Sequence, residues 1–234
     1  YIGEDHIRVA AGSWNFSNLT HSFGPCTHTV NVTLDPLDEL GENDEGNNWN
    51  HSQLTIPLWA YYYGNVSLQK AAQDEAGNTI RQWVSPSDSG NIYFQDIDSD
   101  ISFNNLQPLN GTDDLKELDT AIGSENFTDS VNRTYDPNGD GKADQTRNFS
   151  VLGRTITDVP VVESYPGSPW LTGILWDGSG GGGYDGTQPV LFVTELNKSR
   201  VGAFGTNDYE IRVASLLRDL EGANDMLAVY LEAT

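Results

Sequence analysis

The chain has 234 residues and a formal net charge of −22 at pH 7, because its acidic side chains outnumber its basic ones by 34 to 12. Such a surface repels nucleic acid and anionic lipid, which excludes both as partners. A hydrophobic content of 37% is enough for a folded core and excludes a disordered acidic tail. Cys26 is the single cysteine, so the chain can form no internal disulfide.

Short runs of β-branched and aromatic residues, bounded by Gly, Asn, Asp and Pro, predict strands along almost the whole chain. We expect these strands at Ile7–Ala10, His28–Leu34, Gln53–Trp59, Asn65–Gln69, Thr79–Val84, Asn91–Gln95, Arg147–Leu152, Thr155–Val162, Leu171–Trp176, Pro189–Glu195, Tyr209–Val213 and Met226–Glu232. Helical spacing is confined to Asp113–Ile122 and a short turn at Ala214–Leu220. The sequence therefore predicts a mainly β fold of immunoglobulin-like β-sandwich modules, with one or two short helices.

Two segments indicate how the chain is organised. Trp59–Gly64 (WAYYYG) reads as an aromatic junction, after which the strand pattern restarts, so we expect modules at residues 1–60 and 61–234. Gly178–Gly183 (GSGGGG) lacks the Lys-Ser/Thr ending of a phosphate-binding loop and is predicted to be a long hairpin loop. No run of 18 apolar residues is present, so the sequence predicts no membrane span.

Asn-X-Ser/Thr sequons are unusually frequent. Ten begin at Asn15, Asn18, Asn31, Asn50, Asn65, Asn110, Asn126, Asn132, Asn148 and Asn197, where random placement of the same residues would give about three. A sequon accepts an N-linked glycan only on an exported chain and at an exposed site. We therefore expect a secreted, cell-surface glycoprotein, in a mature form that has lost its export signal. The alternative is that an Asn-rich, Ser/Thr-rich β protein gathers sequons by composition alone.

Oxygen-bearing side chains alternate along Asp136-Pro-Asn-Gly-Asp-Gly-Lys-Ala-Asp144. The expected Ca²⁺ ligands are Asp136, Asn138, Asp140, the main-chain carbonyl of Lys142, and Asp144, with Gly141 at the sharp turn. Arg147 stands where an EF-hand has its bidentate Glu, so the segment resembles the structural calcium loops of dockerins and thrombospondin type 3 repeats. An acidic turn without metal is the alternative. Asp96–Asp100 (DIDSD) is a second acidic cluster of a kind common in turns.

Signatures of catalysis are weak. The histidines His6, His21, His28 and His51 have no zinc-site spacing. Cys26 and His28 point to the same side of an expected strand, but no third group is evident to orient them as nucleophile and base. We therefore expect no enzymatic activity.

Residues 27–56 (THTVNVTLDPLDELGENDEGNNWNHSQLTI) resemble the closing hairpin of CARDB domains, the immunoglobulin-like adhesion modules of bacterial and archaeal surface proteins. The matching parts are Leu34-Asp35-Pro36, the Asn/Glu-rich turn Glu42–Asn48 and the strand Gln53–Ile56. The early strands of a CARDB module are not matched, so the module would be partial. Residues 171–195 and 207–232 resemble, more loosely, exported archaeal surface and pilin-like proteins. These resemblances imply a cell-surface β-domain and no particular activity.

The sequence thus predicts a structural subunit of an extracellular filament or surface layer, N-glycosylated and stabilised by Ca²⁺, whose partners are copies of itself. A sandwich that lacks strands leaves an open edge, which a strand of the next subunit can fill by β-augmentation. The expected donor strand is either Tyr1–Ala10 or Met226–Glu232.

The alternative is an adhesin that binds glycans or other surface proteins. Aromatic faces stack on sugars, and the expected exposed aromatics are Tyr61, Tyr62, Tyr63, Trp170 and Trp176. A secreted enzyme and an archaeal virus capsid protein are more remote alternatives.

Overall fold

The computed structural model describes residues 26–33, 46, 49–73, 79–84, 89–97, 99–217 and 226–233. The chain divides into two compact units, Tyr1–Ile56 and Pro57–Thr234. Antiparallel strands dominate the described residues and are accompanied by two short helices in the second unit, so the predicted mainly β fold class is confirmed. The expected strand Ile7–Ala10 lies outside the described residues.

The first unit contains an antiparallel hairpin of β1 (Cys26–Thr33) and β2 (Trp49–Ile56), in which Cys26 is opposite Ile56 and Thr33 is opposite Trp49. Both strands overlap runs that the alternating pattern predicted. Of the segments that carry the CARDB resemblance, Leu34–Pro36 and most of Glu42–Asn48 lie outside the described residues.

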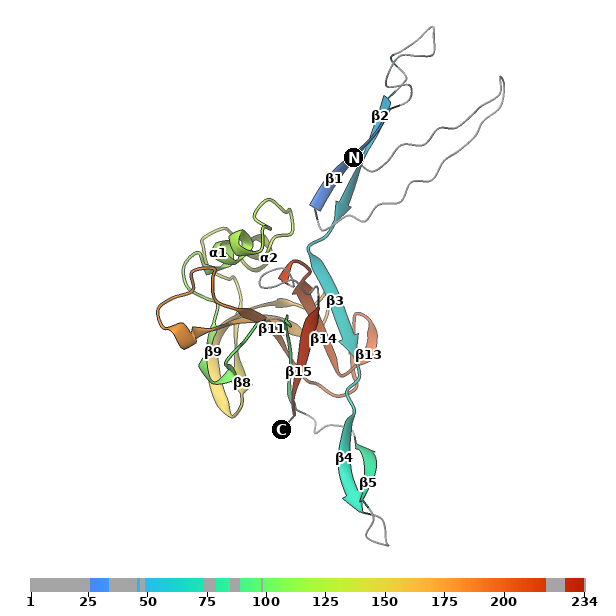
Figure 1. The fold of residues 1–234 in the computed structure, drawn as a ribbon, viewed down its shortest axis with the longest axis vertical. Coiled ribbons are helices and arrows are strands. Elements are labelled where there is room, and N and C mark those ends of the chain that lie inside the picture. Colours follow the sequence, from blue (N-terminus) through green and yellow to red (C-terminus); the bar gives the residue numbers. More distant parts are fainter. Residues whose placement is uncertain are drawn as a thin grey trace, which may run out of the picture. The chain divides into compact units, whose positions relative to one another are not determined.

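The second unit is built on a seven-stranded antiparallel sheet with the order β15-β6-β11-β10-β9-β8, in which β7 also pairs with β10 (Figure 1). Its strands are β6 (Gly90–Asp96), β7 (Leu106–Pro108), β8 (Thr146–Val151), β9 (Arg154–Glu163), β10 (Leu171–Asp177), β11 (Val190–Glu195) and β15 (Leu227–Ala233). β15 therefore forms one edge of this sheet, and β8 forms the other.

The central strands of this sheet are apolar on both faces. In β11, Val190 and Phe192 belong to one buried cluster, whereas Leu191 and Val193 belong to a second cluster on the opposite face. A strand that alternates between two buried faces is a continuous apolar run, which explains why VLFV follows Pro189 without a polar residue.

A second layer consists of β3 (Trp59–Gly64) and β14 (Tyr209–Ala214), which are antiparallel partners (Figure 1). β14 lies across β11 and β10, and its Arg212 N–H donates to Thr172 Oγ1 of β10 at 3.1 Å. β3 lies over β6, since the rings of Tyr62 and Phe94 have centroids 4.9 Å apart. The unit is therefore a two-layer β structure in which the second layer is much narrower than the first.

The segment Trp59–Gly64, interpreted from the sequence as an aromatic junction, is strand β3 and follows the division between the two units at Ile56 and Pro57. An unbroken aromatic run shows no apolar–polar alternation, so the sequence pattern gave no strand signal. The pleat nevertheless divides the run, placing Tyr62 over Phe94 while Tyr61 contacts Tyr165 on the other face.

Helix α1 (Asp114–Ala121) buries Leu115 and Leu118, as its spacing predicted, and α2 (Val131–Tyr135) packs beside it. The remaining elements are the hairpins β4–β5 (Leu68–Gln73, Thr79–Val84) and β12–β13 (Arg200–Gly202, Gly205–Asn207) and the 3₁₀ turns η2 (Phe103–Asn105) and η3 (Gly178–Gly180). The glycine-rich segment connects β10 to β11, which confirms the predicted hairpin loop. The expected turn Ala214–Leu220 falls partly outside the described residues. In the part of the chain that the structure covers, no helix has the length and apolarity needed to cross a bilayer.

Candidate functional site

Eight of the ten sequon asparagines lie among the described residues, and none of these eight is fully buried. Asn31, Asn50, Asn65, Asn126 and Asn148 are exposed, whereas Asn110, Asn132 and Asn197 are half-buried. Asn15 and Asn18 lie outside the described residues. The exposed asparagines meet the steric requirement of a glycan acceptor.

The predicted calcium loop begins where α2 ends, with a buried Asp136. The Asp136 carboxylate accepts hydrogen bonds from the main-chain N–H groups of Gly139 (2.9 Å), Asp140 (3.1 Å) and Gly141 (2.8 Å). Gly141 has φ of +88°, a conformation that glycine adopts at little cost. The loop thus turns sharply at Gly141 around its first carboxylate, at the position where this type of calcium loop has its glycine.

The later positions of the loop are tied to one another. Asn138 Oδ1 accepts the Asp140 N–H at 2.9 Å, Asn138 Nδ2 donates to Asp144 Oδ1 at 2.5 Å, and Asp140 Oδ1 accepts the Lys142 N–H at 3.0 Å. Among the described residues, no group of three or more His, Cys, Asp or Glu side chains forms a set that could hold a metal ion. A Ca²⁺ ion here would therefore need the Asn138 amide and the Lys142 carbonyl beside the carboxylates, which are all the hard oxygen ligands that calcium prefers.

The charged side chains next to the calcium loop are engaged in other contacts. Arg147, at the twelfth position, forms an ion pair with Glu195 at 2.9 Å. Asp113 is held to the loop by its N–H, which donates to the Gly141 carbonyl at 2.9 Å. The Asp113 carboxylate in turn pairs with Lys116, and that hydrogen bond raises the pKa of the lysine. In the second acidic cluster, Asp96 is buried at the end of β6, and residue 98 lies outside the described residues.

One edge of β3 has no strand partner within the described part of the chain, since β3 pairs with β14 alone. The Ser215 N–H donates to the Leu58 carbonyl at 2.8 Å. Together with the register, this bond shows which residues of β3 direct their main-chain groups toward β14. Because these bonds alternate along an antiparallel pair, every second residue of β3 directs its main-chain groups away from β14. Those residues are Trp59, Tyr61 and Tyr63.

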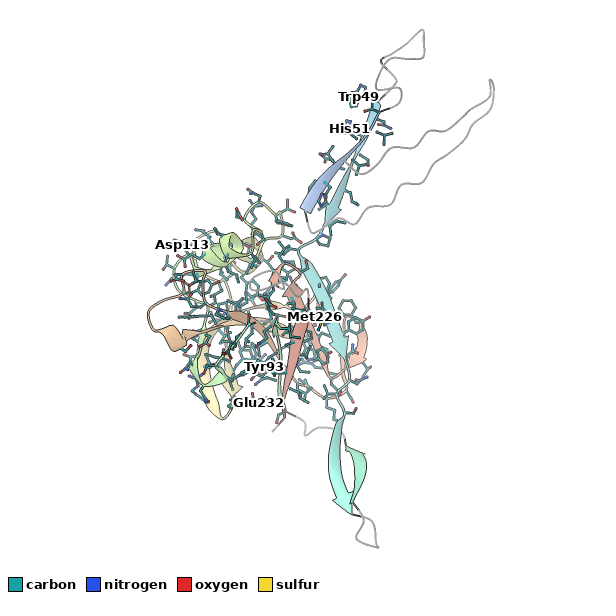
Figure 2. The ribbon with its side chains drawn as sticks, in the orientation of Figure 1. Trp49, His51, Tyr93, Asp113, Met226 and Glu232 are labelled. Atoms are coloured by element: carbon teal, nitrogen blue, oxygen red, sulfur yellow. The ribbon has the colours of Figure 1, made fainter. Side chains whose placement is uncertain are left out.

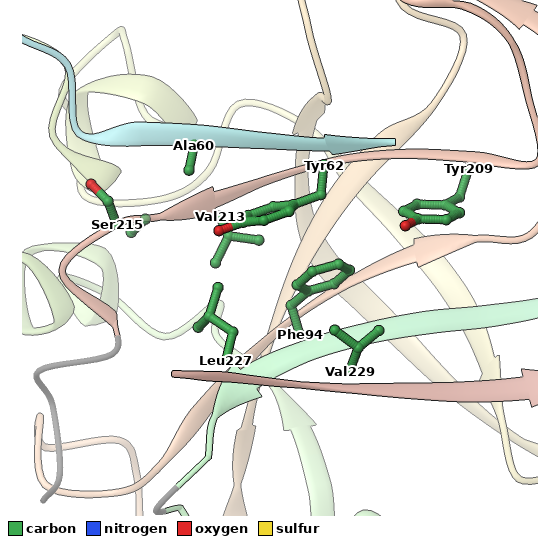
Figure 3. A pocket seen from close by; sticks show the side chains of 9 residues that line it. Ala60, Tyr62, Phe94, Tyr209, Val213, Ser215, Leu227 and Val229 are labelled. Atoms are coloured by element: carbon green, nitrogen blue, oxygen red, sulfur yellow. The ribbon is translucent and has the colours of Figure 1, made fainter. Parts of the chain in front are cut away.

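An apolar groove opens beside this free edge, between β3–β14 and β6–β15. Its volume is about 410 Å³, and it is lined chiefly by Ala60, Tyr62, Phe94, Val213, Leu227 and Val229 (Figure 3). Burial raises the pKa of the Tyr209 hydroxyl, which also borders the groove, so this group stays neutral. Among the described residues that line the groove none is charged, so this lining suits an uncharged, apolar occupant.

The expected donor strand Met226–Glu232 is already paired, because β15 is bonded to β6 along its whole length. Its end is fixed on the face opposite the groove, where Glu232 accepts hydrogen bonds from the Tyr93 hydroxyl, Asn91 Nδ2 (3.0 Å) and the Leu152 N–H (2.7 Å) (Figure 2). The other candidate donor, Tyr1–Ala10, lies outside the described residues.

Four rings form an exposed cluster, here called the aromatic patch, on the face of β3 opposite the groove. Its members are Tyr61, Tyr63, Tyr165 and Phe204. The rings of Tyr63 and Phe204 are stacked with centroids 4.4 Å apart, and the rings of Tyr165 and Phe204 meet edge to face with centroids 4.9 Å apart. The exposed fractions of the three tyrosines lie between 36% and 50%. The expectation that Trp170 and Trp176 are exposed is wrong, since both are buried, at 2% and 3%.

A buried carboxylate positions the patch. Glu210, on β14, accepts hydrogen bonds from the N–H groups of Ala203 (3.1 Å) and Phe204 (3.0 Å) and from the Ser168 hydroxyl (2.7 Å). The Ser168 N–H donates to the Tyr165 carbonyl at 2.8 Å, so one side chain fixes both loops that carry patch residues. This role could not be predicted from the sequence, because Glu210 is one of 34 acidic residues and only folding brings the two loops to it.

Comparisons with protein-family models, with curated proteins and with solved structures give no match to this chain. The function is therefore argued from the residues and the geometry described above.

Proposed function

We propose that this protein is a structural subunit of an extracellular filament or surface layer, glycosylated on its exposed sequons and stabilised by calcium. Neighbouring subunits join by β-augmentation at the free edge of β3. The observation that carries the proposal is the position beside β3, above the apolar inner face of β15, which no strand among the described residues occupies.

The order of strands in the two layers locates this position. β14 lies across β11 and β10, and β3 lies over β6, while β15 is the next strand of the large sheet beyond β6. A strand added to β3 would therefore lie over β15. That strand would cover Val229, which is 55% exposed although it faces the groove.

An added strand stabilises the unit in two ways. Its main chain forms hydrogen bonds with the groups of Tyr61 and Tyr63 that point away from β14. Its inward side chains bury apolar surface at the groove, which contributes about 25 cal/mol per Å². A free β edge beside an apolar groove otherwise promotes aggregation by unspecific strand pairing, so we expect a specific partner to cover it.

The charge of the chain sets the conditions for assembly. A net charge of −22 repels copies of the chain from one another, and salt shortens the range of this repulsion to about 10 Å at 0.1 M. We therefore expect assembly to increase with ionic strength, and calcium to promote it further by binding the loop Asp136–Asp144.

Sedimentation and electron microscopy of the protein, over a series of salt concentrations with and without a calcium chelator, test the proposal. Fibres or sheets that grow with protein and salt concentration, and loosen on chelation, are the expected result. A protein that stays monomeric at every protein, salt and calcium concentration contradicts it.

The aromatic patch favours a second function, an adhesin that binds a glycan. Sugar rings stack on exposed aromatic faces, and such faces are offered by Tyr63 on β3 and by Phe204 on a loop fixed by Glu210. A glycan array probed with the native protein and with Tyr63→Ala separates the two functions. Binding that the substitution abolishes supports the adhesin, whereas an inert array with continued self-association supports the structural subunit.

A further inference from the structure

We infer that the β1–β2 hairpin of a second copy of this chain is the element that adds to the free edge of β3. The inference rests on the proposed function and names the segment that joins neighbouring subunits. Four observations carry it: the incompleteness of the hairpin, its apolar face, the distribution of charge, and the state of the other candidate donors.

The hairpin is an incomplete structure by itself. In the described part of the chain, β1 and β2 pair only with each other. A two-stranded hairpin is marginally stable in water, and a third strand or a covering layer is needed to stabilise it. Addition to β3 supplies both, since β3 is a strand with a free edge and the groove is an apolar surface beside it.

One face of the hairpin carries all of its aliphatic residues and is called its apolar face here. Residues that are directly opposed or two apart share a face, which places Val30, Val32, Leu54 and Ile56 together with the polar residues His28, Asn50 and Ser52. Val32 is 54% exposed and Leu54 is 41% exposed. The other face, called the polar face, carries Thr29, Gln53 and the hydrogen-bonded hydroxyls of Thr27 and Thr55 beside the exposed Trp49. The apolar face therefore offers four aliphatic side chains to the groove, and its use in pairing requires the sequon at Asn50 to be free of glycan.

Charge identifies the occupant as a second copy. About 20% of the residues in this chain are charged, yet β1, β2 and β3 contain no Asp, Glu, Lys or Arg. Two copies that each carry a net charge of −22 approach most easily where both surfaces are uncharged. The strands of the hairpin and the β3 edge are two such surfaces, whereas the segment 34–48 that connects β1 to β2 carries six acidic residues in its sequence.

The other candidate donors are less suitable. Tyr1–Ala10 contains Glu4, Asp5 and Arg8, which would be desolvated in the groove. Met226–Glu232 is hydrogen-bonded to β6, so its donation would break six residue pairs of the large sheet. The hairpin is free of both penalties.

The inferred contact joins two different surfaces, so it is head-to-tail. A contact of this type leaves a free hairpin at one end and a free β3 edge at the other, and repetition gives an open filament when the rotation does not close a ring. This geometry accounts for the extended assembly that the proposed function requires.

Charge substitutions with matched controls test the donor and the acceptor separately. Leu54→Asp places a carboxylate on the apolar face of the hairpin, whereas Gln53→Asp places the same charge on the polar face of the same strand. Val229→Asp places a carboxylate at the groove, whereas Val201→Asp places it at a residue that is 73% exposed on β12. All four positions are exposed, so each variant is expected to fold, which circular dichroism checks.

We expect Leu54→Asp and Val229→Asp to sediment as monomers under conditions where the native protein and both controls assemble. Mixing gives the sharper result, because Leu54→Asp retains a working β3 edge and Val229→Asp retains a working hairpin. An equimolar mixture should form a one-to-one dimer that grows no further, since each variant lacks the surface for the next step.

The outcomes separate the two levels of the proposal. A Leu54→Asp protein that assembles like the native one overturns the assignment of the hairpin, while the structural function stands. A mixture that stays monomeric overturns the head-to-tail contact. A native protein that never associates overturns the proposed function, and the inference with it.

The main-chain contribution has its own test at one position. Tyr63→Pro removes an N–H that points away from β14, and Tyr63→Ala removes the same ring but keeps that N–H. We expect the proline variant alone to lose assembly. Equal behaviour of the two variants contradicts pairing at this edge.

Discussion

Val229 and Phe94 are opposite each other in the register of β15 and β6, yet Val229 is 55% exposed and Phe94 is 3% exposed. Opposed residues of antiparallel strands share a face, so both side chains face the second layer. The difference arises because Tyr62 of β3 covers Phe94, whereas no described residue pairs with the next position beside β3. The second layer therefore ends one strand before the first.

If the loop Asp136–Asp144 binds calcium, Asp140→Asn should lose the stabilisation that calcium gives to the native protein. This substitution removes one carboxylate charge from the loop while keeping an oxygen that can accept the Lys142 N–H. We expect calcium to raise the melting temperature of the native protein and to have little effect on the variant, measured by calorimetry in chelator and in millimolar Ca²⁺. Asp100→Asn is the control, because Asp100 is exposed in the second acidic cluster. A native protein with identical melting curves in both solutions contradicts the calcium site.

Glu210→Gln should destabilise the protein by about 3 kcal/mol, because hydrogen bonds to a charged acceptor contribute about 1.5–3 kcal/mol and the new amide group would face main-chain N–H donors. Urea unfolding measures the change. Glu163→Gln is the matched control: Glu163 is exposed and accepts only the Gly167 N–H at 2.8 Å, so we expect an effect below about 0.5 kcal/mol. Equal effects of the two substitutions would show that Glu210 does not organise the loops of the aromatic patch.

Gly202→Ala should also destabilise the protein, by about 1–3 kcal/mol. A Cβ at this position would overlap Glu210 Oε1 and lie 2.5 Å from the Trp170 ring, and both side chains are buried. Glu210 cannot move aside without breaking its own hydrogen bonds. Gly183→Ala is the control, because no atom lies within 4 Å of the added carbon. We expect thermal unfolding to show the control at or slightly above native stability; a stable Gly202→Ala protein would contradict the close packing.

Glycan occupancy should differ between two neighbouring sequons. Asn110 is half-buried and its Nδ2, the atom that would carry the glycan, donates to the Asp158 carbonyl at 2.9 Å. Asn148 is exposed and uses only its Oδ1, which accepts the Asp158 N–H at 3.2 Å. Mass spectrometry of glycopeptides from native material should therefore find Asn148 occupied more often than Asn110. Higher occupancy at Asn110 would contradict the steric argument, and a protein without any glycan would contradict the prediction from the sequons.

The sequence by itself determined most of the strands. Thr79–Val84 is β5 with the predicted ends, and Leu171–Trp176 differs from β10 by one residue, because β-branched runs between turn residues are a local signal. Helix α1 was likewise predictable from the spacing of Leu115 and Leu118. The sequons and the loop Asp136–Asp144 are also local patterns, readable without any knowledge of the fold.

Only the tertiary structure decided which surfaces are open and which are covered. The pairing of Tyr62 with Ile211 joins residues far apart in the sequence, and it determines that Tyr62 faces the groove while Tyr61 and Tyr63 face the aromatic patch. The burial of Trp170 follows in the same way from distant segments that meet on folding. Local patterns determine which side chains of a strand share a face. The order of strands in the two layers determines what each face contacts. The exposed inner face at Val229 is a consequence of that order alone.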